Sequence, residues 1–165
     1  MNAREKNLEV KSVRNGLGLV ALRAFNPDDL ICRIRGRIVT PKTVWSYWKT
    51  DPRRGANCYR YDTELYLDPE GEIGAFANHS CNPNSRLVRT ASGLQLRALK
   101  KIPVGREVTH DYSTQLGADD IWTMKCNCGE RNCRRVIANI ARLPAAVVSR
   151  YRRLEAIPAF IIETL

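Results

Sequence analysis

Residues that favour turns interrupt this chain at short intervals, and they limit the length of any helix or strand. Glycine, proline and asparagine recur about every ten residues through the first 115 residues, which is typical of many short strands. Between them the chain alternates: in residues 30–39 three arginines face one side and Ile34, Gly36 and Ile38 the other. The sequence therefore predicts mostly β structure in this part of the chain.

The individual elements follow from the same patterns. Residues 8–13 and 19–25 are predicted to be strands around an Asn-Gly turn at 15–18, followed by strands at 30–39, 58–67 and 94–99 and a short helix at 41–49. After Cys133 the spacing of apolar residues changes from that of strands to that of helices. Residues 136–143 have helical spacing, and Pro144 begins a second amphipathic helix. We therefore expect an α+β fold, mostly β, with helices at the C-terminal end.

Composition and charge narrow the class of protein. The chain has 165 residues, enough for one compact domain, and its first residues lack the apolar segment of a secretory signal. We therefore expect an intracellular protein with reduced cysteines. The formal net charge is +10, and residues 125–153 hold Lys125 and seven arginines against the single acid Glu130. Such a region favours acidic partners, above all nucleic acid, although a solvated helical face is an equally good interpretation.

Three of the six cysteines fall within eight residues, at positions 126, 128 and 133. Thiolates this close in sequence can converge on one tetrahedral zinc ion, which in a structural site takes four protein ligands. The fourth ligand is open on spacing alone, and the alternative to zinc is a set of free buried or redox thiols. The candidates for the fourth position are Cys81, His79, Cys58, Cys32 and His110.

Four motifs in order carry a family resemblance. They are Gly16-Leu17-Gly18-Leu19, the run Asn78-His79-Ser80-Cys81-Asn82-Pro83-Asn84, the segment Gly105 to Tyr112 that reads GREVTHDY, and the cysteine triplet. Together these motifs resemble a SET-domain protein-lysine methyltransferase with a cysteine-rich post-SET tail. The resemblance covers residues 10–135, and the order of the motifs makes it specific.

The resemblance implies a fold and a division of the chain. It predicts a SET-domain fold of several small β-sheets in which residues 76–84 and the segment leading to Tyr112 are threaded together as a pseudoknot. The expected boundaries are 1–115 for the SET domain, 116–135 for the post-SET zinc segment and 136–165 for a C-terminal helical extension. It also implies that Cys81 joins Cys126, Cys128 and Cys133 on a structural Zn²⁺.

The implied activity is methyl transfer from S-adenosyl-L-methionine to the ε-amine of a lysine in a protein, such as a histone or another basic protein. The resemblance places Gly16, Leu17, Gly18, Asn78, His79 and Tyr112 at the cofactor, with Tyr112 as the catalytic residue. The alternative is a catalytically silent SET-like module that binds a peptide or nucleic acid. A location in the nucleus or on chromatin is expected in a eukaryote, and in the cytoplasm in a bacterium.

The lysine channel is expected to involve aromatic residues. Tyr59 and Tyr61 lie two apart, on one face of a predicted strand, where the family often lines its channel with a ring. The sequence departs from the family at Ala75, where arginine is usual, and at His110, where Phe or Tyr is usual. The second position controls how many methyl groups are added, so the sequence leaves that number open.

Overall fold

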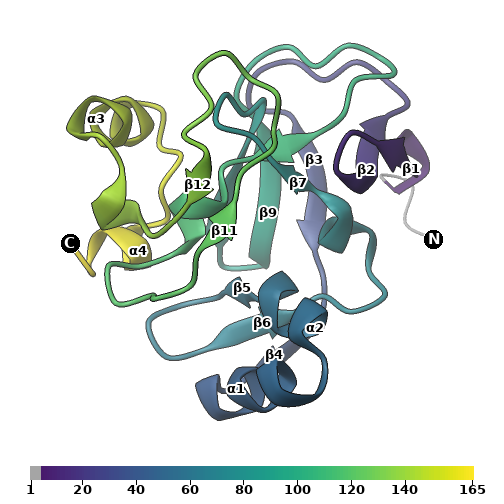
Figure 1. Ribbon diagram of the computed structural model, residues 1–165. Helices are drawn as coiled ribbons and strands as arrows, with labels where there is room; N and C mark the ends of the chain where they lie inside the picture. Colours follow the sequence, from purple (N-terminus) through teal and green to yellow (C-terminus); the bar gives the residue numbers. More distant parts are fainter. Residues whose placement is uncertain (1–4) are drawn as a thin grey trace.

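The computed structural model describes residues 5–165, which form five small β-sheets joined by short helices (Figure 1). Three sheets have two strands: β1 (Leu8–Val13) with β2 (Gly16–Ala21), β7 (Asn78–His79) with β10 (Thr109–His110), and β11 (Met124–Lys125) with β12 (Val136–Ile137). The three-stranded sheets have the orders β3 (Leu30–Ile34), β9 (Gly93–Ala98), β8 (Ser85–Thr90) and β4 (Arg37–Val39), β6 (Tyr66–Asp68), β5 (Tyr59–Arg60). This arrangement confirms the expected class of small sheets with few helices.

The helices are short and lie at two sides of the molecule. Figure 1 shows α1 (Pro41–Thr50) and α2 (Pro52–Asn57) beside the β4–β6–β5 sheet, and α3 (Ala145–Arg153) and α4 (Ala159–Ile162) near the C-terminus. Single 3₁₀ turns cover Glu5–Asn7 (η1), Ile73–Phe76 (η2), Tyr112–Gln115 (η3) and Ile140–Arg142 (η4). Within residues 5–165 no helix has the length and apolar character needed to cross a membrane.

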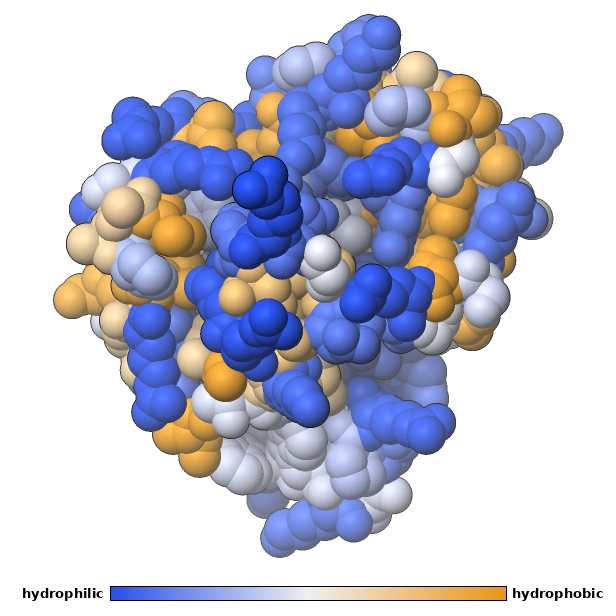
Figure 2. Space-filling view, turned by 45° about the horizontal axis from the view of Figure 1, so that its top comes forward, coloured by the Kyte–Doolittle hydropathy of each residue, from blue (hydrophilic) through white to orange (hydrophobic). Residues whose placement is uncertain are grey.

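The main hydrophobic core lies between the β1–β2 hairpin and the β3–β9–β8 sheet. Leu19, Ile31, Leu87, Leu94 and Leu96 are each fully buried in it. Full burial of one such side chain contributes roughly 1.5–3 kcal/mol to stability, so this cluster alone can hold the sheets together without disulfides. On the face drawn in Figure 2, hydrophilic side chains dominate and smaller hydrophobic patches lie between them.

Strands β7 and β10 pair in parallel although their first members in register, Asn78 and Thr109, are 31 positions apart in the sequence. The backbone N–H of Ser80 continues the pairing by donating to the carbonyl of His110 over 3.0 Å. On the other side of β10, the N–H of Val108 donates to the carbonyl of Leu19 over 2.7 Å. The pairing confirms that the two segments expected to be threaded together lie side by side.

Helix α1 agrees with the predicted helix at residues 41–49. Pro41 occupies its first turn, where the missing N–H costs nothing, and the hydroxyl oxygen of Thr40 accepts a hydrogen bond from the N–H of Thr43. Val44 is buried against Val39 and Cys58 in a separate small cluster. Helix α1 is therefore anchored to the sheet whose end approaches Tyr112.

Two predicted strands are each divided in the structure. The strand predicted at 30–39 breaks between β3 and β4 at Gly36, where a Cβ atom would lie 2.2 Å from the carbonyl oxygen of Asp68. The strand predicted at 58–67 becomes the β5–β6 hairpin, because the Asp62 carboxylate accepts the N–H groups of Glu64 and Leu65 and reverses the chain. Both predictions were right in type and wrong in length.

The helical interpretation of residues 136–143 is wrong. Val136 and Ile137 form β12, which pairs with Lys125 and Met124 of β11 and closes the loop that carries the cysteine triplet. The side chain of Asn139 then donates to the carbonyls of Ala118 and Asp120, and of residues 136–143 only Ile140–Arg142 are helical, as the single 3₁₀ turn η4. The predicted second helix exists, but it ends at Arg153 and is followed by the short α4.

Smaller differences occur at the first hairpin. Its second strand runs over Gly16–Ala21, whereas the sequence placed it at residues 19–25, so both Gly16 and Gly18 belong to the strand. The last predicted strand, at 94–99, is β9 at Gly93–Ala98.

Candidate active site and metal centre

The two histidines of the chain are Cα partners in the β7–β10 register, and the candidate site is built around them. His79 is the last residue of β7 and His110 the last residue of β10. Tyr112 follows two residues later, at the start of η3. The parallel pairing thus brings two motifs that are distant in sequence, residues 78–84 and 105–112, together at the C-terminal ends of β7 and β10.

On one side of this edge His110 lies in an aromatic cluster. Its ring stacks on Tyr59 with centroids 5.8 Å apart and lies 4.8 Å from the ring of Tyr112. The hydroxyl of Tyr59 donates to the carbonyl of Gly74, and that of Tyr112 donates to the carbonyl of Ala77 over 3.1 Å. Burial raises the pKa of both phenols, so both hydroxyls stay protonated and can hold these orientations.

The His110 ring is fully buried, and neither of its nitrogens has a hydrogen-bond partner within residues 5–165. Burial lowers the pKa of His110 to about 4, because no solvent remains to stabilise the charged imidazolium. Gln115 opposes part of this lowering of the His110 pKa. The Oε1 atom of Gln115 is itself buried without a hydrogen bond in the described residues. A buried polar group without a partner is costly, so this neutral ring is suited to contact a polar group that enters the site.

A cavity of about 500 Å³ opens beside this cluster. Tyr112 and Gln115 line it together with residues of α1 and of the segment 119–122. Arg60, which is buried, forms ion pairs in its wall with Asp119 over 2.6 Å and Asp120 over 3.1 Å. The hydrogen bonds from Arg60 lower the pKa of Asp119, whereas burial raises the pKa of Asp120. Of the aromatic cluster, Tyr112 is the member that lines this cavity, whose wall also holds the charges of Arg60, Asp119 and Asp120.

On the far side of β7, three of the resembling motifs meet at Gly18. The Nδ2 group of Asn78 donates to the carbonyl of Leu17 over 3.0 Å and to the Glu107 carboxylate over 2.8 Å. A Cβ atom at Gly18 would lie 2.6 Å from that carboxylate and 2.5 Å from the Val13 side chain, so any other residue would displace this cluster. Glu107 was not among the predicted site residues, although its place in the third motif was a usable signal.

Gly16 lies at the open end of the same hairpin. Its φ of +100° is strained for residues with a side chain, and nothing lies within 4 Å of where a Cβ would be. The exposed backbone of Gly16 and Leu17 can therefore approach a bulky ligand closely, whereas Gly18 is buried beneath it. The donor set and the glycine geometry are compatible with the cofactor that the sequence implies.

Three of the four cysteines predicted to bind zinc gather with His79, and the fourth, Cys133, lies beside Cys126. The Sγ atom of Cys126 lies 3.8 Å from that of Cys81 and 3.6 Å from that of Cys133. The ligand atoms of Cys81, Cys126, Cys128 and His79 all lie within 4.8 Å of one another. Tetrahedral zinc with Zn–S bonds of about 2.3 Å places its sulfurs about 3.8 Å apart, so the sulfur spacing fits the ion.

His79 competes with Cys133 as the fourth ligand, and its hydrogen bonds decide between them. Its Nδ1 accepts a hydrogen bond from the backbone N–H of Tyr112 over 3.1 Å, so the ring proton resides on Nε2. That Nε2 lies 3.3 Å from the Cys81 sulfur and donates to it. A nitrogen that carries a proton has no lone pair for a metal, so His79 orients the sulfur and the four cysteines remain the better ligand set.

The thiols of this cluster have different pKa values. Burial raises the pKa of Cys81 to about 11, while the backbone N–H of Arg135 lowers the pKa of Cys133 to about 7. The Cys81 sulfur also accepts a hydrogen bond from the backbone N–H of Arg134 over 3.4 Å. This N–H donor lowers the raised pKa of Cys81 in part, and it would stabilise the thiolate, the form that metals bind.

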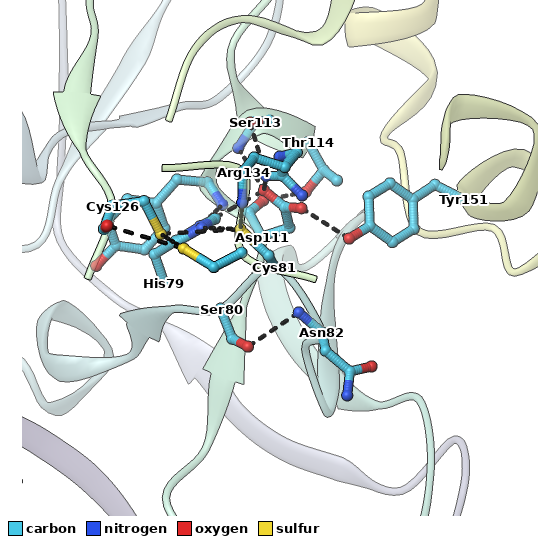
Figure 3. Close-up of polar contacts among 12 residues, drawn as sticks. His79, Ser80, Cys81, Asn82, Asp111, Ser113, Thr114, Cys126, Arg134 and Tyr151 are labelled. Atoms are coloured by element: carbon cyan, nitrogen blue, oxygen red, sulfur yellow. Dashed lines mark hydrogen bonds and ion pairs between the residues drawn. The ribbon is translucent and has the colours of Figure 1, made fainter. Parts of the chain in front are cut away.

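Asp111, between His110 and Tyr112, joins the site to the cysteine segment and to α3 (Figure 3). Its buried carboxylate accepts hydrogen bonds from Arg134 over 2.7 Å and from the hydroxyl of Tyr151 over 2.7 Å. The N–H of Ser113 adds a third donor. Tyr151 was not predicted, because nothing in the sequence relates a tyrosine in α3 to a carboxylate 40 residues earlier.

Tyr61 is not drawn into the aromatic cluster in the way that Tyr59 is. The guanidinium of Arg89 lies 3.9 Å from the centroid of the Tyr61 ring. The Nε of Arg89 also donates a hydrogen bond to the backbone carbonyl of Tyr61. The turn at Asp62 explains the difference, since β5 ends at Arg60 and the two tyrosines no longer share one strand face.

Comparison with known proteins follows the same motifs. The sequence model described as "SET domain" matches residues 16–113. A histone-lysine N-methyltransferase of Mycosarcoma maydis, H3 lysine-4 specific, is 31% identical over 147 residues, which are 83% of this chain and 10% of the relative. An H3 lysine-36 specific enzyme of Cryptococcus neoformans is 32% identical over 133 residues, which are 75% of this chain and 16% of the relative.

Among solved structures, the methyltransferase domain of human histone-lysine N-methyltransferase SETMAR superposes with a TM-score of 0.66. It is 24% identical, and the match covers 80% of this chain and 58% of that chain. This likeness concerns the fold.

Proposed function

This chain belongs to the SET-domain family, and we propose that it transfers a methyl group from S-adenosyl-L-methionine to the ε-amine of a lysine in a protein. The relatives named above carry histone-lysine N-methyltransferase in their names, but this chain spans only 10% and 16% of their length.

One observation supports the proposal most strongly. Tyr112 lines the cavity, and the Glu107 carboxylate of the Gly18–Asn78–Glu107 cluster lies near enough to add to the burial that raises the pKa of its phenol. A methyl donor and an amine must approach from opposite directions along one line, and positioning of this kind supplies much of the catalysis of a displacement. Two separate binding regions that share one tyrosine meet that requirement.

We assign cofactor binding to the β1–β2 hairpin and to the end of β7. The backbone of Gly16, Leu17 and Gly18 would lie along the ligand, and Asn78 would offer its side chain. Because both ring nitrogens of His79 are already used within the protein, its contribution is assigned to its main chain. When bound, S-adenosyl-L-methionine would supply a methyl group on a sulfonium sulfur, and that sulfur leaves as a neutral thioether when the uncharged lysine amine takes the methyl group.

The amine must lose a proton before it can react. A lysine of pKa about 10.4 costs roughly 4–5 kcal/mol to deprotonate at pH 7 in water. A buried channel lowers that cost by desolvating the ammonium form. The Tyr112 hydroxyl donates its proton to the carbonyl of Ala77. Its oxygen lone pairs therefore stay free to accept a hydrogen bond from the amine.

The walls of the proposed channel are Tyr59, Tyr61 and His110. Tyr59 and His110 are in contact with each other, and Tyr59 holds its ring in place through Gly74. Tyr61 lies further out under Arg89, so we assign it to the outer wall. The unpartnered nitrogens of His110 can hydrogen-bond the amine or a water, which would limit the number of methyl groups added.

We propose that Cys81, Cys126, Cys128 and Cys133 hold a structural Zn²⁺. The sulfur spacing and the protonated Nε2 of His79 support this set. The ion would fix residues 126–135 against β7, and the segment boundaries expected from the sequence, at 115 and 135, remain part of the proposal.

A histone is the proposed substrate, because the relatives are named for H3 lysine-4 and H3 lysine-36. Such a substrate would place the enzyme inside the cell, on chromatin in a eukaryote. Nucleic acid is a possible additional partner of the basic C-terminal region, where Arg131, Arg135, Arg142, Arg152 and Arg153 are exposed. Salt-dependent binding of DNA by the intact chain would support this partner.

A methyl-transfer assay tests the function. The chain is incubated with radiolabelled S-adenosyl-L-methionine and a mixture of purified histones and cell proteins, beside Tyr112→Phe and the control Tyr47→Phe. Tyr47 also hydrogen-bonds through its hydroxyl, to Asp68, but does not line the cavity. We expect label in protein with wild type and the control, and a loss of at least about 100-fold with Tyr112→Phe. Failure to label any protein would favour a silent binding module.

A further inference from the structure

All three tryptophans of the chain line the same cavity. Trp45 and Trp48 reach it from α1, and Trp122 reaches it from the segment after η3. Tryptophan offers a large apolar surface with little conformational freedom and is enriched where proteins bind partners. Gathering every tryptophan at one cavity indicates a surface built for contact.

Two of the lining side chains remain strongly exposed at the rim. Trp45 is 59% exposed and Ile121 is 82% exposed, although 76 positions separate them in the sequence. A single exposed apolar side chain is ordinary on a protein surface, but two beside one cavity form a patch. Such a patch gains free energy when an apolar group covers it.

The charges of the cavity favour a cationic occupant. The charged residues that line it are Arg60, Asp119 and Asp120, which together give one negative charge when both acids are ionised. The chain as a whole carries +10. A lysine-bearing segment is therefore attracted to this cavity and repelled by much of the remaining surface.

We propose that this cavity selects protein segments in which a large apolar residue lies two positions from the target lysine. The inference rests on the proposed function, because it uses Tyr112 as the end point of the lysine side chain. In an extended segment, side chains two positions apart point to the same side, about 6.6 Å apart. When the lysine points inward to Tyr112, the side chain two positions away faces the rim formed by Trp45 and Ile121.

The expected selectivity follows from the apolar surface of such a side chain that is removed from water when it binds at the rim. Partial burial of a leucine against the rim corresponds to roughly ten-fold tighter binding than serine at the same position. A leucine next to the lysine points to the opposite side of an extended segment and gains much less.

Intrinsic tryptophan fluorescence measures this binding directly, since every tryptophan lies at the cavity. The probes are eleven-residue peptides without aromatic residues, with one central lysine in a Gly/Ser background and a leucine placed one or two positions before or after it. We expect roughly ten-fold tighter binding with leucine at one of the two positions that lie two residues away. Equal binding of the leucine and all-serine peptides would overturn the proposal.

Surface variants test whether the rim is responsible. Trp45→Ala and Ile121→Ser should each remove most of the preference for leucine, and the remaining tryptophans still report binding. Val104→Ser is the matched control, because Val104 is also exposed, at 64%, but does not line the cavity. A leucine preference that survives in both rim variants contradicts the proposal.

Binding is measured without methyl transfer, so the two proposals can fail separately. Leucine-selective binding by a chain that methylates no protein would refute the proposed function and leave the selectivity standing. Methylation of lysines regardless of the residue two positions away would refute the selectivity alone.

Discussion

The two histidines are register partners in the β7–β10 pair and both rings lie against Tyr112, yet their hydrogen bonding is different. His79 uses both ring nitrogens: one accepts from the N–H of Tyr112 and the other donates to the Cys81 sulfur. His110 lies among aromatic rings, and its nitrogens have no hydrogen-bond partner in the described part of the chain. Burial lowers the pKa of each to about 4, so both rings are neutral at physiological pH.

The difference separates a structural role from a role toward a ligand. The satisfied ring of His79 is part of the fold and orients the proposed zinc site, as ligand-supporting groups commonly do. The unsatisfied ring of His110 raises the cost of the folded state until a polar group reaches it. Equal burial and equal pKa shifts therefore say less about function than the hydrogen-bond partners do.

Removing a sulfur from the cysteine side is the largest change that the comparison predicts. Cys81→Ser should lose most of the bound zinc, lower the free energy of unfolding by more than about 3 kcal/mol and weaken cofactor binding together with it. Metal content, urea unfolding and cofactor titration measure these effects. Cys58→Ser, outside the cluster, should keep its zinc; a Cys81→Ser protein with full zinc would contradict the ligand set.

Exchanging each histidine for phenylalanine tests whether the cysteine cluster and the aromatic cluster act independently. His79→Phe should lower zinc affinity by 10- to 100-fold, because the sulfur of Cys81 loses its N–H donor. His110→Phe should leave zinc affinity unchanged, since its ring lies on the aromatic side. Competition with a chromophoric chelator measures both. A similar loss in the two variants would mean that the sides are not independent.

The contact from α3 to Asp111 is expected to have a moderate effect. Tyr151→Phe removes a donor at 2.7 Å from a buried carboxylate, so the free energy of unfolding should fall by about 2 kcal/mol. The matched change Tyr47→Phe removes a more accessible hydroxyl–carboxylate bond and should cost less. Urea unfolding of both variants gives the comparison, and equal costs would refute a special role for the Asp111 cluster.

The smallest effect concerns pH. The pKa of His110 is about 4 in the folded chain and about 6.5 when unfolded, so the unfolded state binds more protons between these values. The contribution of His110 to stability is therefore complete above pH 6.5 and is lost as pH falls toward 4, at up to about 1.4 kcal/mol per unit. His110→Phe should show a shallower decline between pH 6.5 and 5. Parallel stability curves would contradict the buried neutral ring.

Much of the site was predictable from the sequence because motif order relates distant segments. The sequence related Cys81 to the triplet 45 residues later, and in the structure the Cys81 sulfur lies 3.8 Å from that of Cys126, so the proposed zinc ligands are neighbours in space. The pairing of the segments at 78 and 109 followed from the same resemblance.

Other features depend on contacts that no local pattern contains. The helical spacing of residues 136–143 was overridden by pairing with β11 and by the hydrogen bonds of Asn139. The tautomer of His79 depends on the N–H of Tyr112, which lies 33 residues away in sequence. The link from Tyr151 to Asp111 could be found only after α3 had been placed in space.

The central claim is that Tyr112 and the aromatic side carry methyl transfer while the cysteine side only supports the fold. Its most direct test measures bound zinc and the rate of methyl transfer on the same samples of wild type and Tyr112→Phe. The account predicts equal zinc and a loss of at least about 100-fold in rate. Undiminished transfer by the zinc-replete variant would contradict it.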